Sequence, residues 1–235
     1  MYKLIAFDLD GTLTQHRSKL GEENRSVLNE LAKRYKLIMV GAGGCERIFT
    51  QMNEYPIDII GYYGMQESVM KDGKPDIIRS EFYTVDKDYF TNTCAYLRQK
   101  YGYTEYKGDA VEFHATGAVT FPLLGKSADI ADKIAFDPDR KKRAVMYDEV
   151  CTLFKGFNVF IGGSSSFDIV KDEFNKYNAL MRYMKEHNLS QDEIMYVGDD
   201  FGVGGNDEHV KKGGLNYTFI DDYTKLGERL AFLLK

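Results

Sequence analysis

Two aspartates follow an apolar run near the N-terminus and stand two residues apart. Residues 4–7 (LIAF) are wholly apolar, which predicts a buried strand, and residues 8–12 (DLDGT) follow directly. Residues i and i+2 of an extended chain point to the same side. Asp8 and Asp10 would therefore both face the crevice at the carboxyl end of the strand, where open α/β sheets bind ligands. The structural alternative is a turn or a helix cap, since Asp and Gly form both.

A second acidic loop makes this pair a candidate metal site. Residues 193–197 (EIMYV) predict another buried strand, and Asp199 comes two residues after it. A phosphoryl group is anionic, so carboxylates beside it would repel it unless a cation lies between them. Mg²⁺ prefers oxygen ligands and binds through one or two carboxylates together with a substrate phosphate. We expect Asp8 and Asp199 to hold Mg²⁺, Asp207 to orient waters around it, and Asp10 to remain free for proton transfer.

The elements around these residues alternate between strands and helices at both ends of the chain. This rhythm predicts a doubly wound parallel sheet, because parallel strands are joined by crossover helices. The strand-like runs are residues 4–7, 36–40, 57–60 and 193–197, and the helical patterns are residues 21–35, 45–53 and 176–188.

The pattern changes between about residues 82 and 171. A helix, a hairpin, a second helix and a second hairpin follow one another there, which is typical of an α+β unit with a mostly antiparallel sheet. We therefore predict an α/β fold: a doubly wound parallel-sheet core, residues 1–81 and 172–235, with an inserted α+β cap domain, residues 82–171. The elements expected in the cap are helices at 86–101 and 137–155 and strands at 110–114, 118–123, 157–161 and 167–170.

Composition and charge argue against several classes of function. The chain has 235 residues, 43% of them apolar, and its net charge of −5 disfavours a nucleic-acid partner held by phosphate contacts. No apolar run approaches the roughly 18 residues of a membrane span, and no signal peptide is evident. We therefore expect no membrane partner and a cytoplasmic location. The basic run at 140–143 (RKKR) is flanked by acids, which predicts a solvated helix face.

Taken together, the motifs resemble the haloacid dehalogenase superfamily of aspartate-nucleophile phosphotransferases, and within it the eukaryotic-type phosphomannomutase branch. The resemblance covers nearly the whole chain and is strongest at its two ends. The residues that carry it are 8–14 (DLDGTLT) followed by Arg17, 198–199 (GD) followed by 204–207 (GGND), and 166–168 (SFD) after the glycines at 162–163.

The resemblance implies a role for each of these residues. Asp8 would be the nucleophile that becomes an aspartyl phosphate, and Asp10 the general acid and base, with its backbone carbonyl as a further metal ligand. Lys176 would stabilise the transferring phosphoryl group. The residues that would contact the substrate are Arg17, Ser166, Asp168 and Asn206.

Structural alternatives remain for the residues outside the acidic loops. Lys176 stands at the start of a predicted helix, where an exposed lysine is common. Ser166 and Asp168 alternate along a predicted strand, so both could lie on an exposed sheet face.

Two departures from the family pattern affect the predicted reaction. The family has Ser or Thr after its second strand, whereas this chain has Gly-Ala-Gly-Gly at 41–44, so the backbone amides of Gly43 and Gly44 are expected to bind the phosphoryl oxygen instead. The mutase cap carries arginines that bind a second phosphate. The corresponding residues 112–127 contain only Lys126 as a cation, and Lys lacks the bidentate geometry of Arg.

These observations favour an Mg²⁺-dependent phosphatase that acts on a small phosphorylated metabolite such as a sugar phosphate. A phosphomannomutase-type sugar phosphomutase is the second hypothesis. A non-catalytic module that binds phosphate and Mg²⁺ is the third. The resemblance also suggests a homodimer formed through the cap.

Overall fold

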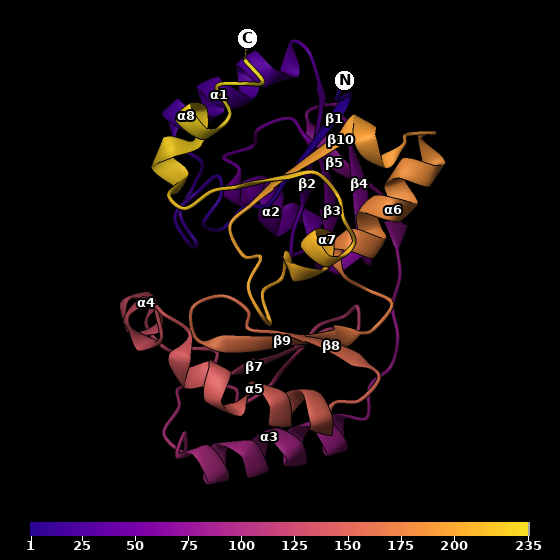
Figure 1. Cartoon of the computed structure of the whole chain (residues 1–235). Coiled ribbons are helices and arrows are strands. Elements are labelled where there is room, and N and C mark those ends of the chain that lie inside the picture. The colour runs from indigo at the N-terminus through magenta and orange to yellow at the C-terminus, as the bar shows by residue number, and fades with distance from the viewer. Residues whose placement is uncertain (235) are drawn as a thin grey trace. The chain divides into compact units, whose positions relative to one another are not determined.

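The computed structural model describes residues 1–234, which form two compact units. The core unit contains residues 1–81 and the chain from Asn175 onwards, and the inserted unit is Phe82–Phe174. Both ends of the chain, indigo and yellow in Figure 1, therefore belong to one unit. Between residues 1 and 234, no helix is both long and apolar enough to cross a membrane.

A seven-stranded sheet forms the centre of the core unit. Its order is β11-β10-β1-β2-β3-β4-β5, and the five strands from β11 to β3 are parallel to one another. The predicted parallel α/β core is confirmed. The strands are β1 (Leu4–Phe7), β2 (Lys36–Val40), β3 (Asp58–Gly61), β4 (Gln66–Lys71), β5 (Lys74–Ser80), β10 (Ile194–Gly198) and β11 (Tyr217–Phe219).

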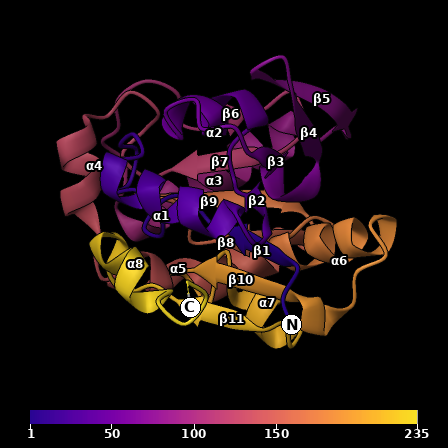
Figure 2. The same ribbon diagram turned by 90° about the horizontal axis from the view of Figure 1, so that it is seen from above.

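Helices cover both faces of this sheet, which explains why its central strands are apolar throughout. Ile5 and Phe7 of β1 belong to one buried cluster, whereas Leu4 and Ala6 belong to another on the opposite face. The first cluster includes residues of α1 (Glu22–Ala32), α2 (Cys45–Gln51) and α8 (Leu226–Arg229), and the second includes residues of α6 (Lys176–Glu186) and α7 (Glu208–Lys212) (Figure 2). Short 3₁₀ turns span Tyr62–Gly64, Gln191–Glu193 and Tyr223–Lys225.

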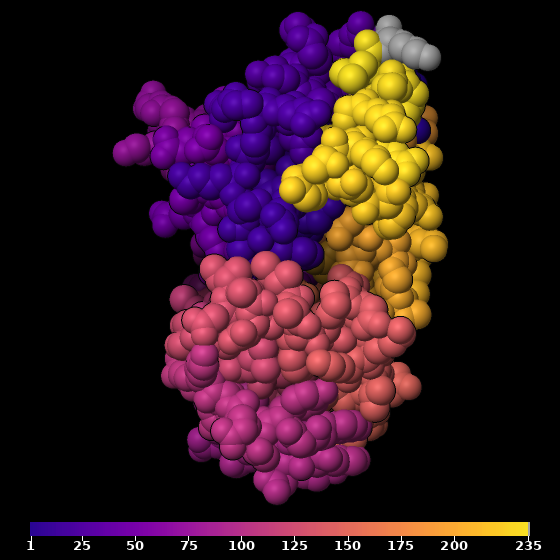
Figure 3. Space-filling view, turned by 90° about the vertical axis from the view of Figure 1, so that its left-hand side faces the viewer, coloured from indigo at the N-terminus to yellow at the C-terminus, as the bar shows by residue number. Residues whose placement is uncertain are grey.

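The N-terminal and C-terminal segments of the core unit lie side by side, as their indigo and yellow surfaces show in Figure 3. The side-chain amide of Asn24 on α1 donates to the backbone carbonyl oxygens of Leu13 and Tyr223, at 2.9 Å each. This buried residue therefore joins the loop after β1 to the C-terminal region.

The β4–β5 hairpin at the sheet edge is an element that the sequence patterns did not predict. It pairs antiparallel to β3 and turns at Asp72 and Gly73, which both have positive φ. β5 is the largely exposed edge strand, whereas β4 is partly buried between β3 and β5. Both strands mix polar with apolar residues, so neither an apolar run nor a regular alternation identifies them. The Asp-Gly dipeptide was the available signal.

The inserted unit consists of a four-stranded antiparallel sheet and three helices. The sheet order is β6-β7-β9-β8, and α3 and α5 lie on one side of this sheet (Figure 1). Both helices share a buried apolar cluster with its strands. The short helix α4 was not predicted. The elements are α3 (Lys87–Tyr101), β6 (Glu112–Phe113), β7 (Val119–Pro122), α4 (Ile130–Phe136), α5 (Lys141–Leu153), β8 (Phe157–Phe160) and β9 (Ser166–Lys171).

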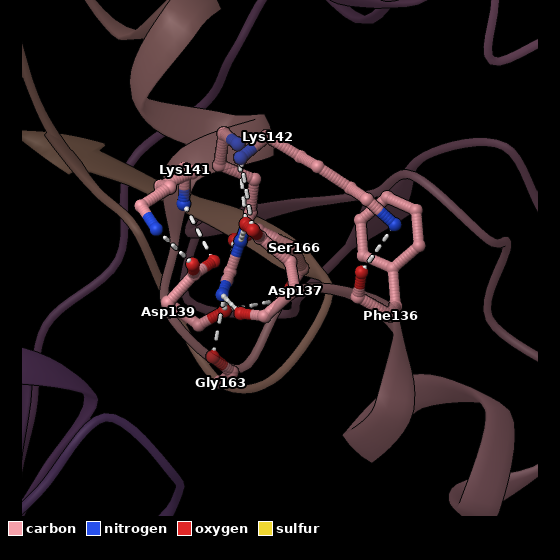
Figure 4. A network of polar contacts seen from close by, with 9 residues as sticks. Phe136, Asp137, Asp139, Lys141, Lys142, Gly163 and Ser166 are labelled. Carbon is pink, nitrogen blue, oxygen red and sulfur yellow. Dashed lines mark hydrogen bonds and ion pairs between the residues drawn. The ribbon is translucent and has the colours of Figure 1, made fainter.

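The basic run at 140–143 is not a solvated face throughout, and the prediction is wrong for Arg143. Its side chain is 1% exposed and lies 2.8 Å from the carboxylate of Asp137. It also donates to the carbonyl oxygens of Gly162, Gly163 and Ser166 at 2.9–3.1 Å. Figure 4 shows the surrounding polar network, with Asp137, Gly163 and Ser166 labelled. Arg143 therefore fixes the turn between β8 and β9 from the inside.

The same carboxylate explains why α5 begins at Lys141 rather than at the predicted residue 137. Asp137 accepts hydrogen bonds from the backbone N–H groups of Lys142 and Arg143, at 2.9 and 3.1 Å. Its side chain satisfies amides that have no partner within the first turn of the helix, so Asp137 itself lies outside the helix.

Removal of the Arg143 guanidinium is expected to destabilise the inserted unit strongly. Arg143→Met would leave Asp137 as an unpaired buried carboxylate, and we expect a loss of about 3 kcal/mol in the free energy of unfolding. Urea denaturation followed by circular dichroism measures it. Lys141→Met is the matched control, because its exposed pair with Asp139 should contribute less than about 1 kcal/mol. A loss for Arg143→Met no larger than that of the control would contradict the assignment.

Candidate active site

Two neighbouring parallel strands bring the acidic loops together. Residues of β1 and β10 are paired in register, Phe7 with Val197, so Asp8 and Asp199 emerge from the same edge of the sheet. Carboxylate oxygens of Asp8, Asp199 and Asp207 lie within 4.8 Å of one another. The three side chains thus form one cluster at the carboxyl ends of the strands, where open α/β sheets bind ligands.

Gly11 and Thr12 allow the two loops to approach closely. Gly11 has a φ of +93°, and a Cβ there would lie 2.3 Å from Oδ2 of Asp199. Thr12 donates from Oγ1 to Oδ1 of Asp199 at 3.1 Å. The glycine and threonine of DLDGT are therefore explained by the position of the second acidic loop, in addition to the turn that Gly11 makes.

Lys176 is fully buried within the cluster, so the alternative of an exposed lysine at a helix start is wrong. Its Nζ lies 2.5 Å from Oδ1 of Asp8, 2.7 Å from Oδ1 of Asp207 and 2.8 Å from Oδ1 of Asn206. Burial alone would lower the pKa of Lys176, but attraction to Asp207 and Asp8 outweighs burial and raises that pKa. The ammonium stays charged and uses all three of its protons.

Asp207 is held by the protein on both of its oxygens. Oδ1 accepts from Lys176 and from the hydroxyl of Tyr196 at 2.5 Å, and Oδ2 accepts from the backbone N–H of Asp200 at 3.0 Å. Sequence reasoning missed Tyr196, whose only signal was a polar tip within an apolar strand. The carboxylate of Asp200 accepts from the backbone N–H of Asn206 and shapes the loop.

The cluster carries more negative than positive charge. Burial, with repulsion from Asp8 and Asp207, raises the pKa of Asp199 to about 9. Burial also raises the pKa of Asp8 to about 6, although Lys176 opposes that rise. Three carboxyl groups face one ammonium group, so the cluster lacks positive charge. A bound divalent cation would supply that charge.

The donor set fits Mg²⁺, because the cluster offers carboxylate oxygens without sulfur or imidazole. Asp8 and Asp199 are the residues best placed to bind the ion directly, with the backbone carbonyl of Asp10 as the further ligand implied by the motif. Asp207 already accepts three hydrogen bonds, so it is better suited to orienting groups around the ion than to binding it.

The Asp10 carboxylate is held by groups from a different direction. Its Oδ1 accepts from Nε2 of Gln51 at 2.6 Å and from the backbone N–H of Arg17 at 2.7 Å. Its Oδ2 lies 3.9 Å from Nη2 of Arg47. Sequence reasoning missed Gln51 and Arg47, which lie one helical turn apart on α2. Arg17 meets Asp10 through its backbone, and its own side chain is exposed.

Backbone amides are also available near the carboxylates. Within residues 1–234, the N–H groups of Leu9, Asp10, Gly43 and Gly44 donate to no backbone carbonyl oxygen. The next amide, that of Cys45, donates to Oε1 of Gln66 at 3.0 Å. The predicted amide donors at Gly43 and Gly44 are thus not used by backbone carbonyl groups and could donate to an anion.

The remaining candidates, Ser166, Asp168 and Lys126, belong to the inserted unit, and the first two lie on β9. Asp168 accepts from Oγ1 of Thr120 at 3.0 Å, and Ser166 donates to the carbonyl of Gly162 at 3.0 Å. Lys126 is paired with Glu112 at 2.9 Å, so its charge is already partly compensated.

Arg98 is another cation of the inserted unit, and it has a structural role. Its guanidinium is buried and donates to the carbonyl oxygens of Tyr103, Ala110 and Leu123 at 2.7–3.1 Å. The guanidinium therefore supports the loops after α3 and β7.

Comparison with known proteins gives consistent findings. A family model described as haloacid dehalogenase-like hydrolase matches residues 67–207. Phosphomannomutases of Schizosaccharomyces pombe and Spinacia oleracea are each 27% identical to the chain over 88% of its length, and the match covers 84% and 85% of those proteins. The phosphomannomutase of Saccharomyces cerevisiae is 24% identical, with 94% of this chain and 86% of that protein covered.

Solved structures share the fold at lower identity. IMP-bound IMP-nucleotidase of Plasmodium falciparum, truncated at its N-terminus, has a TM-score of 0.65 and 13% identity, covering 99% of this chain and 68% of that one. A haloacid dehalogenase-like hydrolase from B. subtilis has a TM-score of 0.62 and 17% identity, covering 97% and 98%. These likenesses concern the fold.

The carboxylate cluster predicts that Mg²⁺ stabilises the folded chain. Mg²⁺ at about 100 times its Kd should add about 2.7 kcal/mol of stability, which raises Tm by about 5 °C or more for a chain of this size. Asp199→Ala should lose most of this shift. Asp76→Asn, an exposed carboxylate on β5, should keep it. Thermal unfolding with and without chelator provides the measurement, and an equal shift in Asp199→Ala would refute the site.

Proposed function

Because the chain belongs to the haloacid dehalogenase-like hydrolases, we propose that it hydrolyses small phosphate monoesters, sugar phosphates among them, through an aspartyl phosphate on Asp8. The observation that supports this most directly is the buried contact between Lys176 and Asp8 beside Asp199 and Asp207. This contact supports the proposal, because a nucleophile, a cation and a metal site are needed close together in such a reaction.

Asp8 is proposed to attack phosphorus with one carboxylate oxygen. The bond to phosphorus forms as the bond from phosphorus to the ester oxygen breaks, and Asp10 supplies the proton that the leaving oxygen takes. Water then attacks the aspartyl phosphate, Asp10 takes a proton from that water, and inorganic phosphate leaves. Both half-reactions use the same proton carrier, so the cycle restores the starting protonation state.

Charge on the transferring group is proposed to be balanced by Lys176 and by the free amides of Leu9 and Asp10. Neutralising the equatorial oxygens is the main catalytic task in phosphoryl transfer. Mg²⁺, when bound to Asp8 and Asp199, would add charge neutralisation and hold a phosphate oxygen. The amides of Gly43 and Gly44 take the place of the hydroxyl that the family pattern has after the second strand.

The inserted unit is proposed to act as the cap that selects the substrate. Ser166, Asp168 and Lys126 are its candidate contacts. Lys126 is the only Lys or Arg between residues 112 and 127, and it is paired with Glu112. A mutase must bind a second phosphate firmly while the intermediate turns around, and a lone paired lysine suits that task poorly. This supports hydrolysis over transfer.

A sugar phosphomutase is the second candidate, and the named relatives favour it. The relatives from fission yeast, spinach and budding yeast are all called phosphomannomutase. The same nucleophile and proton carrier serve both reactions, because a mutase differs in the acceptor of the phosphoryl group.

Asp8→Asn is expected to abolish turnover, since an amide cannot form the covalent intermediate at a useful rate. With p-nitrophenyl phosphate, Asp10→Asn should slow phosphate release by about 100-fold or more, mainly at the hydrolysis of the aspartyl phosphate, because p-nitrophenolate leaves without a proton whereas the attacking water must lose one. Phosphate release from p-nitrophenyl phosphate with Mg²⁺ provides the measurement, and Asp76→Asn is the control for general effects of losing a carboxylate. Near-normal activity in Asp8→Asn would rule out the mechanism.

Phosphatase and mutase differ in where the phosphoryl group goes. With mannose 1-phosphate or glucose 1-phosphate and a catalytic amount of the bisphosphate, we expect free phosphate to form faster than the 6-phosphate isomer. Lys126→Arg restores a bidentate cation and should strengthen bisphosphate binding without making isomer formation dominant. If the unmodified chain forms isomer faster than phosphate, the mutase assignment replaces the phosphatase.

A further inference from the structure

Arg47 is a cation beside the candidate active site that the mechanism above does not use. It lies in the first turn of α2, and its side chain is 52% exposed. The guanidinium packs directly on the backbone of Gly43, where a Cβ would lie 2.3 Å from Nε of Arg47. Gly43 therefore leaves the space that Arg47 occupies. A Ser or Thr at this position, as in the family pattern, would collide with this guanidinium.

The hydrogen-bonding capacity of Arg47 is largely unused. A guanidinium has five N–H donors, and its charge-assisted bonds to oxygen are about 2.7–2.9 Å long. The acceptors near Arg47 are more distant: Oε1 of Gln51 lies 3.4 Å from Nη1, and Oδ2 of Asp10 lies 3.9 Å from Nη2. Asp10 instead makes its short contacts with Gln51 and with the backbone N–H of Arg17. The guanidinium of Arg47 therefore has N–H groups that can donate to an additional anion.

The position of Arg47 indicates which part of a substrate it would meet. Asp10 is the group proposed to protonate the ester oxygen, so that oxygen must come within hydrogen-bond distance of it. Arg47 lies next to the same carboxylate. A substrate group bound by Arg47 would thus be attached close to the ester oxygen, within one or two carbon atoms, and would belong to the leaving group.

We propose that Arg47 binds a second anionic group of the substrate, so that the preferred substrates are phosphate esters with a carboxylate or a second phosphate adjacent to the ester oxygen. Phosphorylated hydroxy acids, including phosphorylated sugar acids, meet this requirement. The inference rests on the proposed function, because it takes Asp10 as the proton donor to the leaving oxygen. Arg47 is then a specificity-determining residue that touches substrate.

A pair of esters that differ only in the second anion tests this assignment. 2-Phosphoglycerate and glycerol 2-phosphate share a carbon skeleton, and one has a carboxylate where the other has a hydroxymethyl group. The unmodified chain, with Mg²⁺, should prefer 2-phosphoglycerate in kcat/KM. Arg47→Met should reduce that preference by about 10- to 100-fold, mainly through KM, because a hydrogen bond to a charged group is lost.

Two further variants separate charge from geometry. Arg47→Lys keeps the charge without the fork and should retain part of the preference. Arg34→Met removes an exposed arginine that follows α1, and the preference should be unchanged. Glycerol 1,2-bisphosphate, compared with glycerol 2-phosphate, shows whether a second phosphate is recognised in place of a carboxylate. Thermal unfolding confirms that each variant is folded.

An unchanged preference in Arg47→Met would overturn the proposal. If kcat falls equally for both esters, Arg47 acts through Asp10 and does not contact the substrate. If the unmodified chain hydrolyses neither ester nor p-nitrophenyl phosphate, the proposed function fails. In that case calorimetric Kd values for the two esters, with Mg²⁺, decide the role of Arg47: a preference lost in Arg47→Met supports it, and a preference retained refutes it.

Discussion

The buried ammonium of Lys176 is the interaction on which the rest of the site depends. Its three short contacts connect β1 through Asp8, the start of α6, and the loop after β10 through Asn206 and Asp207. A buried cation requires this many partners, because desolvation disfavours the charge unless carboxylates surround it. This ion-pair network joins the segments before and after the inserted unit in addition to the pairing of β1 with β10. It also leaves a net negative charge where a metal ion would bind.

Close packing at glycines completes that arrangement. A side chain at Gly11 would overlap Asp199, and one at Gly198 would lie 2.3 Å from Oδ2 of Asp207. The carboxylates can approach one another only because the backbone there carries no Cβ. At Gly43 the missing side chain likewise leaves room for the guanidinium of Arg47. Glycines therefore permit close packing both within the carboxylate cluster and beside Asp10.

The sequence sufficed for the parts of the fold that depend on local pattern. Apolar runs identified β1, β2 and β10, and the edge of a parallel sheet then placed Asp8 beside Asp199. It did not predict the β4–β5 hairpin, whose strands mix polar with apolar residues without a regular alternation. Nor could it predict Gln51, Arg47, Tyr196 or the buried Arg143, because these side chains matter through partners distant in sequence or through burial, neither of which has a periodic signal.

The location of Arg47 also bears on the choice between hydrolysis and transfer. In a hexose bisphosphate the two phosphates lie at opposite ends of the sugar, so a mutase needs its second cation far from the reacting oxygen. Arg47 lies 3.9 Å from the carboxylate proposed to serve that oxygen, which is too close to hold the remote phosphate. In the inserted unit, Lys126 is paired with Glu112, and Arg98 and Arg143 are buried against backbone carbonyls. The location of Arg47 therefore supports the proposed recognition of charge beside the scissile bond, and with it the proposed hydrolysis of small phosphorylated acids.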